Sequence, residues 1–265
     1  MAGDYEYRGL MARAWDLLRG DTSTWPDREF YRAVIERRGG PALDVGCGTG
    51  RLLLDYLAIG LDVDGVDNSP EMLAICREKA EGLGIDVASR LFEQEMDALT
   101  TPRRYATIFV PSLSFQLLTD PSSAARAMER FHDGLAPGGM LVVSFKSRLW
   151  PGRRTPPQMA WTDWFNAGAR ERGEDRATIR RWTRARFDHG EQLEHEENRY
   201  QVLRDGVVVE EEFHRRSPCV RWYSQGQAAE LFDRAGFGAV TATAADGFAP
   251  AAPEDNSFKI WGARE

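Results

Sequence analysis

The feature that most constrains this chain is a glycine-rich turn at residues 43–50, which read LDVGCGTG. The turn grows out of a short apolar run, 41–45, and residues 51–60 follow it with a helical pattern that ends at Gly60. Glycine lets a backbone adopt positive φ angles and lie close to a neighbouring group. A strand, a tight turn and a helix in this order indicate an open α/β sheet, in which ligands bind at the carboxyl ends of the strands.

Strand-like and helix-like segments alternate along residues 28–146. Further helices are predicted at 28–38, from Pro70 onward after Ser69, and at 121–135. Strands are predicted at 41–45, 61–67, 87–92, 105–111 and 140–145. This alternation favours a parallel sheet with helices on both faces, since strands as apolar as these need cover on both sides.

The pattern changes after Lys146. Residues 147–160 read as a loop, and 179–223 suit antiparallel strands with a hairpin turn at Asp205-Gly206. A helix at 225–235 and strands at 238–244 and 257–263 follow. We therefore predict three segments: N-terminal helices with an α/β core (1–146), an insertion (147–222), and a C-terminal helix and strands that complete the core sheet (223–265).

Composition narrows the class of protein. The 265 residues suit one α/β domain with an insertion, and 34 basic against 41 acidic residues give a net charge of −7, which argues against a nucleic-acid partner. Three widely spaced cysteines without a C-x-x-C motif indicate reduced thiols, and no metal-ligand cluster is evident. The charged N-terminus and the absence of an apolar run of 18 residues predict a cytoplasmic protein that spans no membrane.

The loop is G-x-G-x-G, one residue tighter than the dinucleotide-binding fingerprint, and it lacks the lysine of a phosphate-binding loop. Four further stretches follow in order: 65–73 (GVDNSPEML), 94–99 (QEMDAL), 109–115 (FVPSLSF) and 135–139 (LAPGG). Together the five stretches resemble class I S-adenosylmethionine (SAM)-dependent methyltransferases, in particular small-molecule types such as amino-sugar and natural-product N- or O-methyltransferases. The resemblance covers about residues 28–146.

The resemblance implies a fold and a cofactor. The implied fold is α/β: a Rossmann-like seven-stranded methyltransferase sheet with helices on both faces and an antiparallel β insertion before the last helix and hairpin. The cofactor is SAM, with S-adenosylhomocysteine as product. Asp44 would lie near the amino-acid part of SAM, Asp67 would hold both ribose hydroxyls, and Glu95 or Asp97 would contact adenine. The implied cofactor-binding set is Asp44, Gly46, Cys47, Gly48, Gly50, Asp67, Asn68, Glu95, Met96, Pro111 and, as a lid, Trp15.

Methyl transfer is an in-line displacement that chiefly requires positioning, with a base only where the acceptor must lose a proton. His214 and His195 in the insertion are the candidate bases, although pairing of each with a cross-strand glutamate is the commoner explanation for histidines in such strands. Four arginines, at positions 180, 181, 184 and 186, surround Trp182. This pattern favours cross-strand pairing with the acidic residues that follow, and the alternative is an anion-binding patch.

We therefore expect a methyltransferase acting on an oxygen or nitrogen atom of a small-molecule metabolite. The alternatives are an RNA methyltransferase, opposed by the acidic charge and by PSLS where base methylases carry N-P-P-Y, and a SAM-binding scaffold or non-methylating enzyme. An NAD oxidoreductase ranks last. Exposed insertion strands make a homodimer an open possibility.

Overall fold

The computed structural model describes residues 7–147, 156–173 and 175–265. These residues form two compact units. The larger unit comprises residues 23–147 and 222–265, and the smaller unit comprises residues 7–22 and 156–221. Most of the predicted loop at 147–160 lies outside the described residues. The grouping of residues 7–22 with the insertion differs from the predicted segment 1–146.

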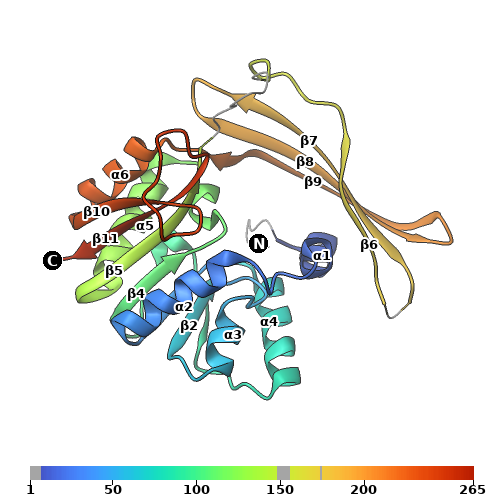
Figure 1. The fold of residues 1–265 in the computed structure, drawn as a ribbon. Coiled ribbons are helices and arrows are strands. Elements are labelled where there is room, and N and C mark those ends of the chain that lie inside the picture. Colours follow the sequence, from blue (N-terminus) through green and yellow to red (C-terminus); the bar gives the residue numbers. More distant parts are fainter. Residues whose placement is uncertain (1–6, 148–155, 174) are drawn as a thin grey trace. The chain divides into compact units, whose positions relative to one another are not determined.

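The larger unit is built on a seven-stranded sheet (Figure 1), in the order β10-β11-β5-β4-β1-β2-β3. Strand β11 runs antiparallel to both of its neighbours, and the other central pairs are parallel. The predicted Rossmann-like sheet is therefore confirmed. Its strands are β1 (Ala42–Val45), β2 (Val63–Asp67), β3 (Leu91–Glu93), β4 (Tyr105–Val110), β5 (Leu135–Lys146), β10 (Phe237–Ala244) and β11 (Ser257–Arg264).

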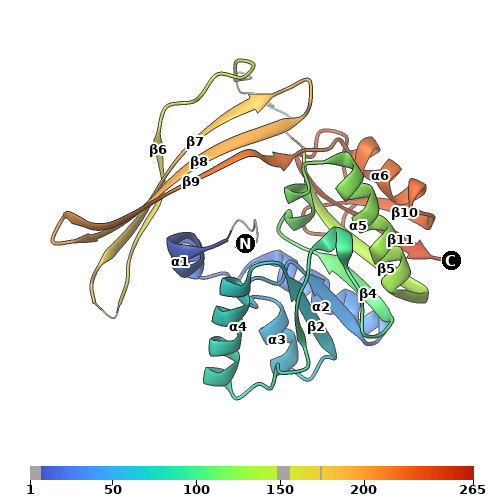
Figure 2. The same ribbon diagram turned by 180° about the vertical axis from the view of Figure 1, so that it is seen from behind.

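Helices cover both faces of this sheet. Figure 1 shows α2 in front of the sheet, and Figure 2, the view from behind, shows α5 in front of it. Alternate residues of the stretches 108–110 in β4 and 140–143 in β5 pack into two separate apolar cores, which explains why these stretches are apolar on both faces. One face carries α2 (Pro26–Arg38), α3 (Leu53–Ala58) and α4 (Pro70–Leu83), and the other carries α5 (Pro121–Gly134) and α6 (Gln225–Arg234).

Local chemistry sets the ends of several elements. Ser69 caps α4 by accepting the Met72 N–H at 3.1 Å, with Pro70 in the first turn as predicted. Ser224 and Gln227 form a capping box at the start of α6. The predicted strand at 87–92 is shorter than expected, because Asp86 Oδ1 accepts the Ala88 N–H in a local turn and strand pairing begins only at Leu91.

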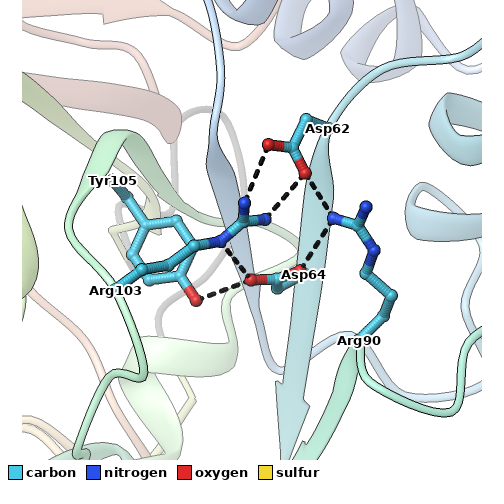
Figure 3. A network of polar contacts seen from close by, with 5 residues as sticks. All are labelled: Asp62, Asp64, Arg90, Arg103 and Tyr105. Carbon is cyan, nitrogen blue, oxygen red and sulfur yellow. Dashed lines mark hydrogen bonds and ion pairs between the residues drawn. The ribbon is translucent and has the colours of Figure 1, made fainter.

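Five charged and polar residues join the amino ends of β2 and β4 (Figure 3). Asp64, which is buried, accepts from Arg90 at 3.1 Å, from Arg103 Nε at 2.8 Å and from Tyr105 Oη at 2.8 Å. Asp62 accepts from both terminal nitrogens of Arg103 and also from Arg90. Since each carboxylate is matched by guanidinium donors, this cluster stabilises the strand starts.

The smaller unit pairs helix α1 (Gly9–Arg19) with a four-stranded antiparallel sheet. The sheet order is β6 (Phe165–Glu171), β7 (Thr178–Asp188), β8 (Leu193–Arg204) and β9 (Val207–Arg221). The turn between β8 and β9 has positive φ at Asp205 and Gly206, so the predicted hairpin is confirmed. Apolar residues of α1 pack on β7 and β8, which explains why α1 groups with the insertion. The residues of this core are Leu10, Met11, Ala14, Ala177, Ile179, Tyr200 and Val202.

Two features are absent from the described part of the chain. No helix in this part of the chain is long and apolar enough to cross a membrane. Residues 7–147, 156–173 and 175–265 contain no group of three or more histidine, cysteine, aspartate or glutamate side chains arranged to hold a metal ion.

Candidate cofactor-binding site

The glycine loop connects β1 to α3 at the carboxyl edge of the sheet. The Gly46 and Cys47 N–H groups both donate to the Val66 carbonyl, at 2.8 and 3.0 Å, which ties the loop to β2. Gly46 has φ +75°, and a Cβ on it would lie 2.7 Å from Ser114 Oγ. Gly50 has φ +83°, and a Cβ there would lie 2.5 Å from Cys76 Sγ. Only glycine fits these positions, so the loop presents bare backbone at this edge.

Asp67 ends β2 beside the glycine loop. Its Oδ2 accepts the Gly48 N–H and its Oδ1 accepts the Ser69 N–H, both at 2.9 Å. Burial raises the pKa of the Asp67 carboxyl, while these backbone donors act to lower it. Two bonds leave each oxygen with a further lone pair, so the fixed carboxylate is able to accept two more donors, such as a pair of vicinal hydroxyls.

Asp44 lies one strand away and is almost completely buried. Its Oδ1 has no hydrogen-bond partner among the described residues. Burial raises the pKa of this carboxyl to about 8, against the lowering effect of Arg51 and with further raising by Asp67 and Asp27. A buried carboxyl without a donor is costly, so the position suits a ligand that brings an ammonium or another donor.

Arg51, the cation that acts to lower the pKa of this carboxyl, is already engaged in an ion pair. Arg51 Nη1 and Nη2 donate to Asp27 Oδ1 and Oδ2 at 3.0 and 2.5 Å, and the guanidinium lies over the Trp25 ring at 5.1 Å. Sequence reasoning missed this group. Arg51 directly follows the glycine loop, so its place near the site was predictable. Asp27 is 24 residues away on α2, and no local sequence pattern indicates that it pairs with Arg51.

The structure separates the two carboxylates that the sequence left open as adenine contacts. Asn68 Nδ2 donates to Glu95 Oε1 and Oε2 at 3.3 and 3.1 Å, and Glu95 also raises the pKa of Asp67. Asp97 instead accepts from Arg126 of α5 at 2.7 Å. Glu95 therefore belongs to the cluster around Asp67, whereas Asp97 is engaged with α5.

The segment that follows β4 is strained. Ser112 and Leu113 both have positive φ, +53° and +69°, although neither is glycine. Each such residue costs about 1–2 kcal/mol, and strain of this kind concentrates at functional sites. The segment runs from Pro111 into the short helix η2 (Ser114–Leu117), whose first residue packs against Gly46. The predicted Pro111 thus begins the segment that reaches the glycine loop at Ser114.

Cys47 contributes backbone only. Its side chain is buried in the apolar core against Leu53 and Gly65, and burial raises the pKa of its thiol well above the ordinary value. Cys76 and Cys219 are likewise buried, and all three cysteines are free thiols, as predicted.

Three predicted site residues belong to the smaller unit. Trp15 packs edge-on against Tyr7, with ring centroids 4.8 Å apart. His195 Nδ1 lies 2.7 Å from Ser217 Oγ, and burial, aided by Arg186, lowers the pKa of its imidazole. His214 Nε2 lies 3.1 Å from Glu212 Oε2. Their roles toward a cofactor or substrate stay predictions.

The arginines of β7 bond across the sheet. Arg180 donates to Gln201 at 2.7 Å, Arg181 to Asn198 at 2.8 Å, and Arg184 to Glu197 at 2.7 Å. Arg181 also donates to Glu196 at 3.0 Å, so the predicted cross-strand pairing with acidic residues is confirmed for Arg181 and Arg184, whereas the acceptor of Arg180 is an amide. Because their guanidinium groups already have acceptors, they are poor candidates for a free anion-binding patch.

Comparison with known proteins agrees with this geometry. Residues 42–139 match the family model described as a methyltransferase domain. The chain is 34% identical over 139 residues to the demethylmenaquinone methyltransferase of Thermus thermophilus, which covers 50% of this chain and 61% of that protein. It is 38% identical over 144 residues to the ribosomal protein L11 methyltransferase of Xylella fastidiosa, covering 54% of this chain and 40% of that one. The chain thus spans less than two thirds of either relative.

Solved structures extend the likeness to nearly the whole chain. A SAM-bound amino pentose methyltransferase of calicheamicin biosynthesis from Micromonospora echinaspora has a TM-score of 0.67 at 19% identity, covering 99% of this chain and 100% of that one. A sugar N-methyltransferase from a Streptoalloteichus species has a TM-score of 0.64 at 22% identity, covering 100% and 98%. The fold is that of the class I methyltransferases, and the part of the chain that matches a methyltransferase domain is residues 42–139.

Proposed function

We propose that the protein is a SAM-dependent methyltransferase that transfers a methyl group to an oxygen or nitrogen atom of a small-molecule metabolite. The observation that carries the proposal is the Asp67 carboxylate, held by the Gly48 and Ser69 N–H groups beside a loop on which only glycine fits. A fixed acceptor for two hydroxyls next to bare backbone is what a ribose and its neighbouring atoms require.

The other residues of the site fit the rest of SAM. Asp44 supplies a buried acceptor for the ammonium of the methionine part, since no described residue donates to its Oδ1. Glu95 is assigned to adenine in preference to Asp97, because Asp97 already accepts a hydrogen bond from Arg126. Further contacts assigned to SAM are those of Gly46, Cys47, Gly50, Asn68, Met96 and Pro111, with Trp15 as a lid. SAM supplies an electrophilic methyl group, so the chain's task is to hold the two reactants in line.

The small-molecule assignment has three supports. The chain is acidic, the similar structures include methyltransferases of sugars and natural products, and the arginines of β7 are paired within the sheet. We assign residues 147–222 to substrate cover or subunit pairing, and 1–146 with 223–265 to cofactor binding. The free, buried cysteines support a reducing compartment, the cytoplasm.

A base is required only for acceptors that must lose a proton. His195 Nδ1 lies 2.7 Å from Ser217 Oγ, which orients its ring, and burial lowers the pKa of its imidazole. His214 lies beside Glu212, which orients its ring. Replacement of either by Gln tests its role: loss of turnover with unchanged SAM affinity identifies the base, and unchanged turnover in both variants leaves catalysis to positioning alone.

The first experiment is calorimetric titration of the protein with SAM. Asp67→Asn removes charge-assisted bonds worth about 1.5–3 kcal/mol, so the affinity is expected to fall about 10- to 150-fold. Asp86→Asn is the matched control, because Asp86 also accepts a backbone N–H, from Ala88, but an asparagine oxygen preserves that bond. Absence of saturable SAM binding by the folded protein refutes the proposal.

Turnover separates an enzyme from a binding scaffold. Release of S-adenosylhomocysteine is measured over a panel of amino sugars, phenols and small carboxylates, with an RNA transcript included as the alternative acceptor. Acceptor-dependent release from a small molecule supports the proposal. Binding of SAM without release from any acceptor favours the scaffold, and release with RNA alone favours the RNA methyltransferase.

A further inference from the structure

Asp44 is a buried carboxyl group, and one of its oxygens lacks a hydrogen-bond donor. Only 2% of the residue is exposed, and no side chain or backbone N–H within residues 7–147, 156–173 and 175–265 donates to its Oδ1. Its neighbours across the sheet are Gly65 on β2 and Phe109 on β4, and neither carries a side-chain charge. Burial without a donor destabilises the ionised carboxylate relative to the neutral acid. The position therefore favours a protonated Asp44.

The charges that act on Asp44 favour the neutral acid as well. Arg51 stabilises an ionised Asp44, but its two terminal nitrogens donate to Asp27 Oδ1 and Oδ2, at 3.0 and 2.5 Å. Asp27 on α2 and Asp67 on β2 act in the opposite direction, so one positive charge is set against two negative ones. Burial, aided by these two carboxylates and opposed by Arg51, raises the pKa of Asp44 to about 8.

Three further titratable groups interact electrostatically with Asp44. They are Tyr31 on α2, Tyr56 on α3 and Cys47 in the glycine loop. Burial raises the pKa of each of these three side chains, so all of them are uncharged near neutral pH. The charge balance at Asp44 is therefore set by Arg51 and the two carboxylates, and not by these groups.

We propose that Asp44 is protonated in the ligand-free protein and releases this proton to the solvent when SAM binds. The inference rests on the proposed function, in which the ammonium of the methionine part lies against Asp44. An ammonium group is a donor only, and it binds a carboxylate more strongly than it binds a neutral acid. The O–H bond of Asp44 therefore breaks, its proton passes to the buffer, and the ammonium keeps its own protons and donates to the carboxylate.

Proton release makes the affinity for SAM depend on pH. Between about pH 6 and 7.5 each bound SAM displaces one proton, so the affinity is expected to rise about tenfold per pH unit. Above about pH 8 Asp44 is already ionised in the free protein, whereas an α-ammonium group loses its own proton at about pH 7.7–8.0, so the affinity is expected to fall. The affinity therefore has its maximum at about pH 8.

Calorimetric titration with SAM at about pH 6.5 counts the released protons. The titration is made in two buffers that take up a proton with different enthalpies, such as PIPES and imidazole, and the difference in heat is expected to correspond to about one proton per SAM. The matched ligand is 5′-methylthioadenosine, which keeps the adenosine part and lacks the ammonium, so it is expected to release no proton from Asp44. The matched variant is Asp44→Asn, which keeps the size of the side chain, has no acidic proton, and is expected to bind SAM with the same heat in both buffers.

Infrared difference spectra of the wild type give a second measurement that does not depend on the variant. The carbonyl band of a protonated carboxylic acid is expected to disappear when SAM binds and to persist with 5′-methylthioadenosine. Saturable SAM binding without buffer-dependent heat overturns this inference and leaves the proposed function standing. Equal proton release by 5′-methylthioadenosine or by Asp44→Asn overturns it in the same way. Failure of the folded wild type to bind SAM overturns both.

Discussion

Replacement of Gly46 by alanine isolates the steric demand of the glycine loop. The backbone at Gly46 has φ +75°, and an added Cβ would lie 2.7 Å from Ser114 Oγ and 2.8 Å from Ser114 Cβ. Both distances are well inside van der Waals contact. The substitution therefore forces an alanine into the left-handed region and at the same time pushes the segment after β4 away from the loop.

The two effects have separate magnitudes. Left-handed backbone costs alanine about 1–2 kcal/mol, and overpacking of a well-filled site costs about 1–3 kcal/mol, so Gly46→Ala is expected to lower the free energy of unfolding by about 2–5 kcal/mol. Gly138 provides the control. It has φ +74°, nearly the same angle, but nothing lies within 4 Å of its added Cβ. Gly138→Ala is therefore expected to cost only the backbone part, about 1–2 kcal/mol.

Urea denaturation of the two variants measures the difference. Adding Ser114→Gly to Gly46→Ala removes the contact. The double variant is expected to recover most of the stability lost to overpacking, while the stability lost to the left-handed backbone is not recovered. If Gly46→Ala is no more destabilising than Gly138→Ala, or if Ser114→Gly restores nothing, the claim that Ser114 closes this site to a side chain is wrong.

Three further predictions concern the carboxylates. The free energy of unfolding of Asp44→Asn, relative to that of the wild type, is expected to rise between pH 4 and 8 by at most about 1.4 kcal/mol per pH unit. Because burial raises the Asp44 pKa to about 8, the native wild type resists deprotonation over this range and loses stability as pH rises, whereas the variant has no such group. Urea titrations at pH 5 and 8 measure it, and a pH-independent difference contradicts it. Asp62→Asn is expected to lower the melting temperature most above pH 4 and least near pH 2, because hydrogen bonds from Arg103 and Arg90 hold the Asp62 pKa at about 2. A melting-temperature difference that widens in acid contradicts this. Glu95→Gln is expected to weaken SAM binding about tenfold by calorimetry, with little effect of Asp97→Asn, and the reverse order would assign adenine to Asp97.

Much of the fold followed from local patterns. The order of strands and helices, the cap at Ser69 and the hairpin at Asp205-Gly206 were predictable because capping, turn chemistry and hydrophobic periodicity act over a few residues. Element ends were less accurate. The helix predicted at 51–60 spans only Leu53–Ala58, because the turn after Gly50 continues before regular helix begins.

The packing of α1 was not predictable in the same way. Its apolar residues are compatible with any apolar surface. No sequence pattern indicates that the surface against which they pack belongs to strands more than 150 residues later. Grouping of α1 with the insertion is decided by those long-range contacts.

By itself the sequence determined the α/β class, the glycine loop and the carboxylate at Asp67, because each depends on residue types at fixed short spacings. Only the tertiary structure decided that Arg51 pairs with Asp27, that Asp44 Oδ1 has no donor within residues 7–147, 156–173 and 175–265, and that Asp97 pairs with Arg126. These outcomes depend on which side chains the packing of distant helices and strands brings within hydrogen-bonding distance. Such pairings are set by the whole fold, and no local spacing encodes them.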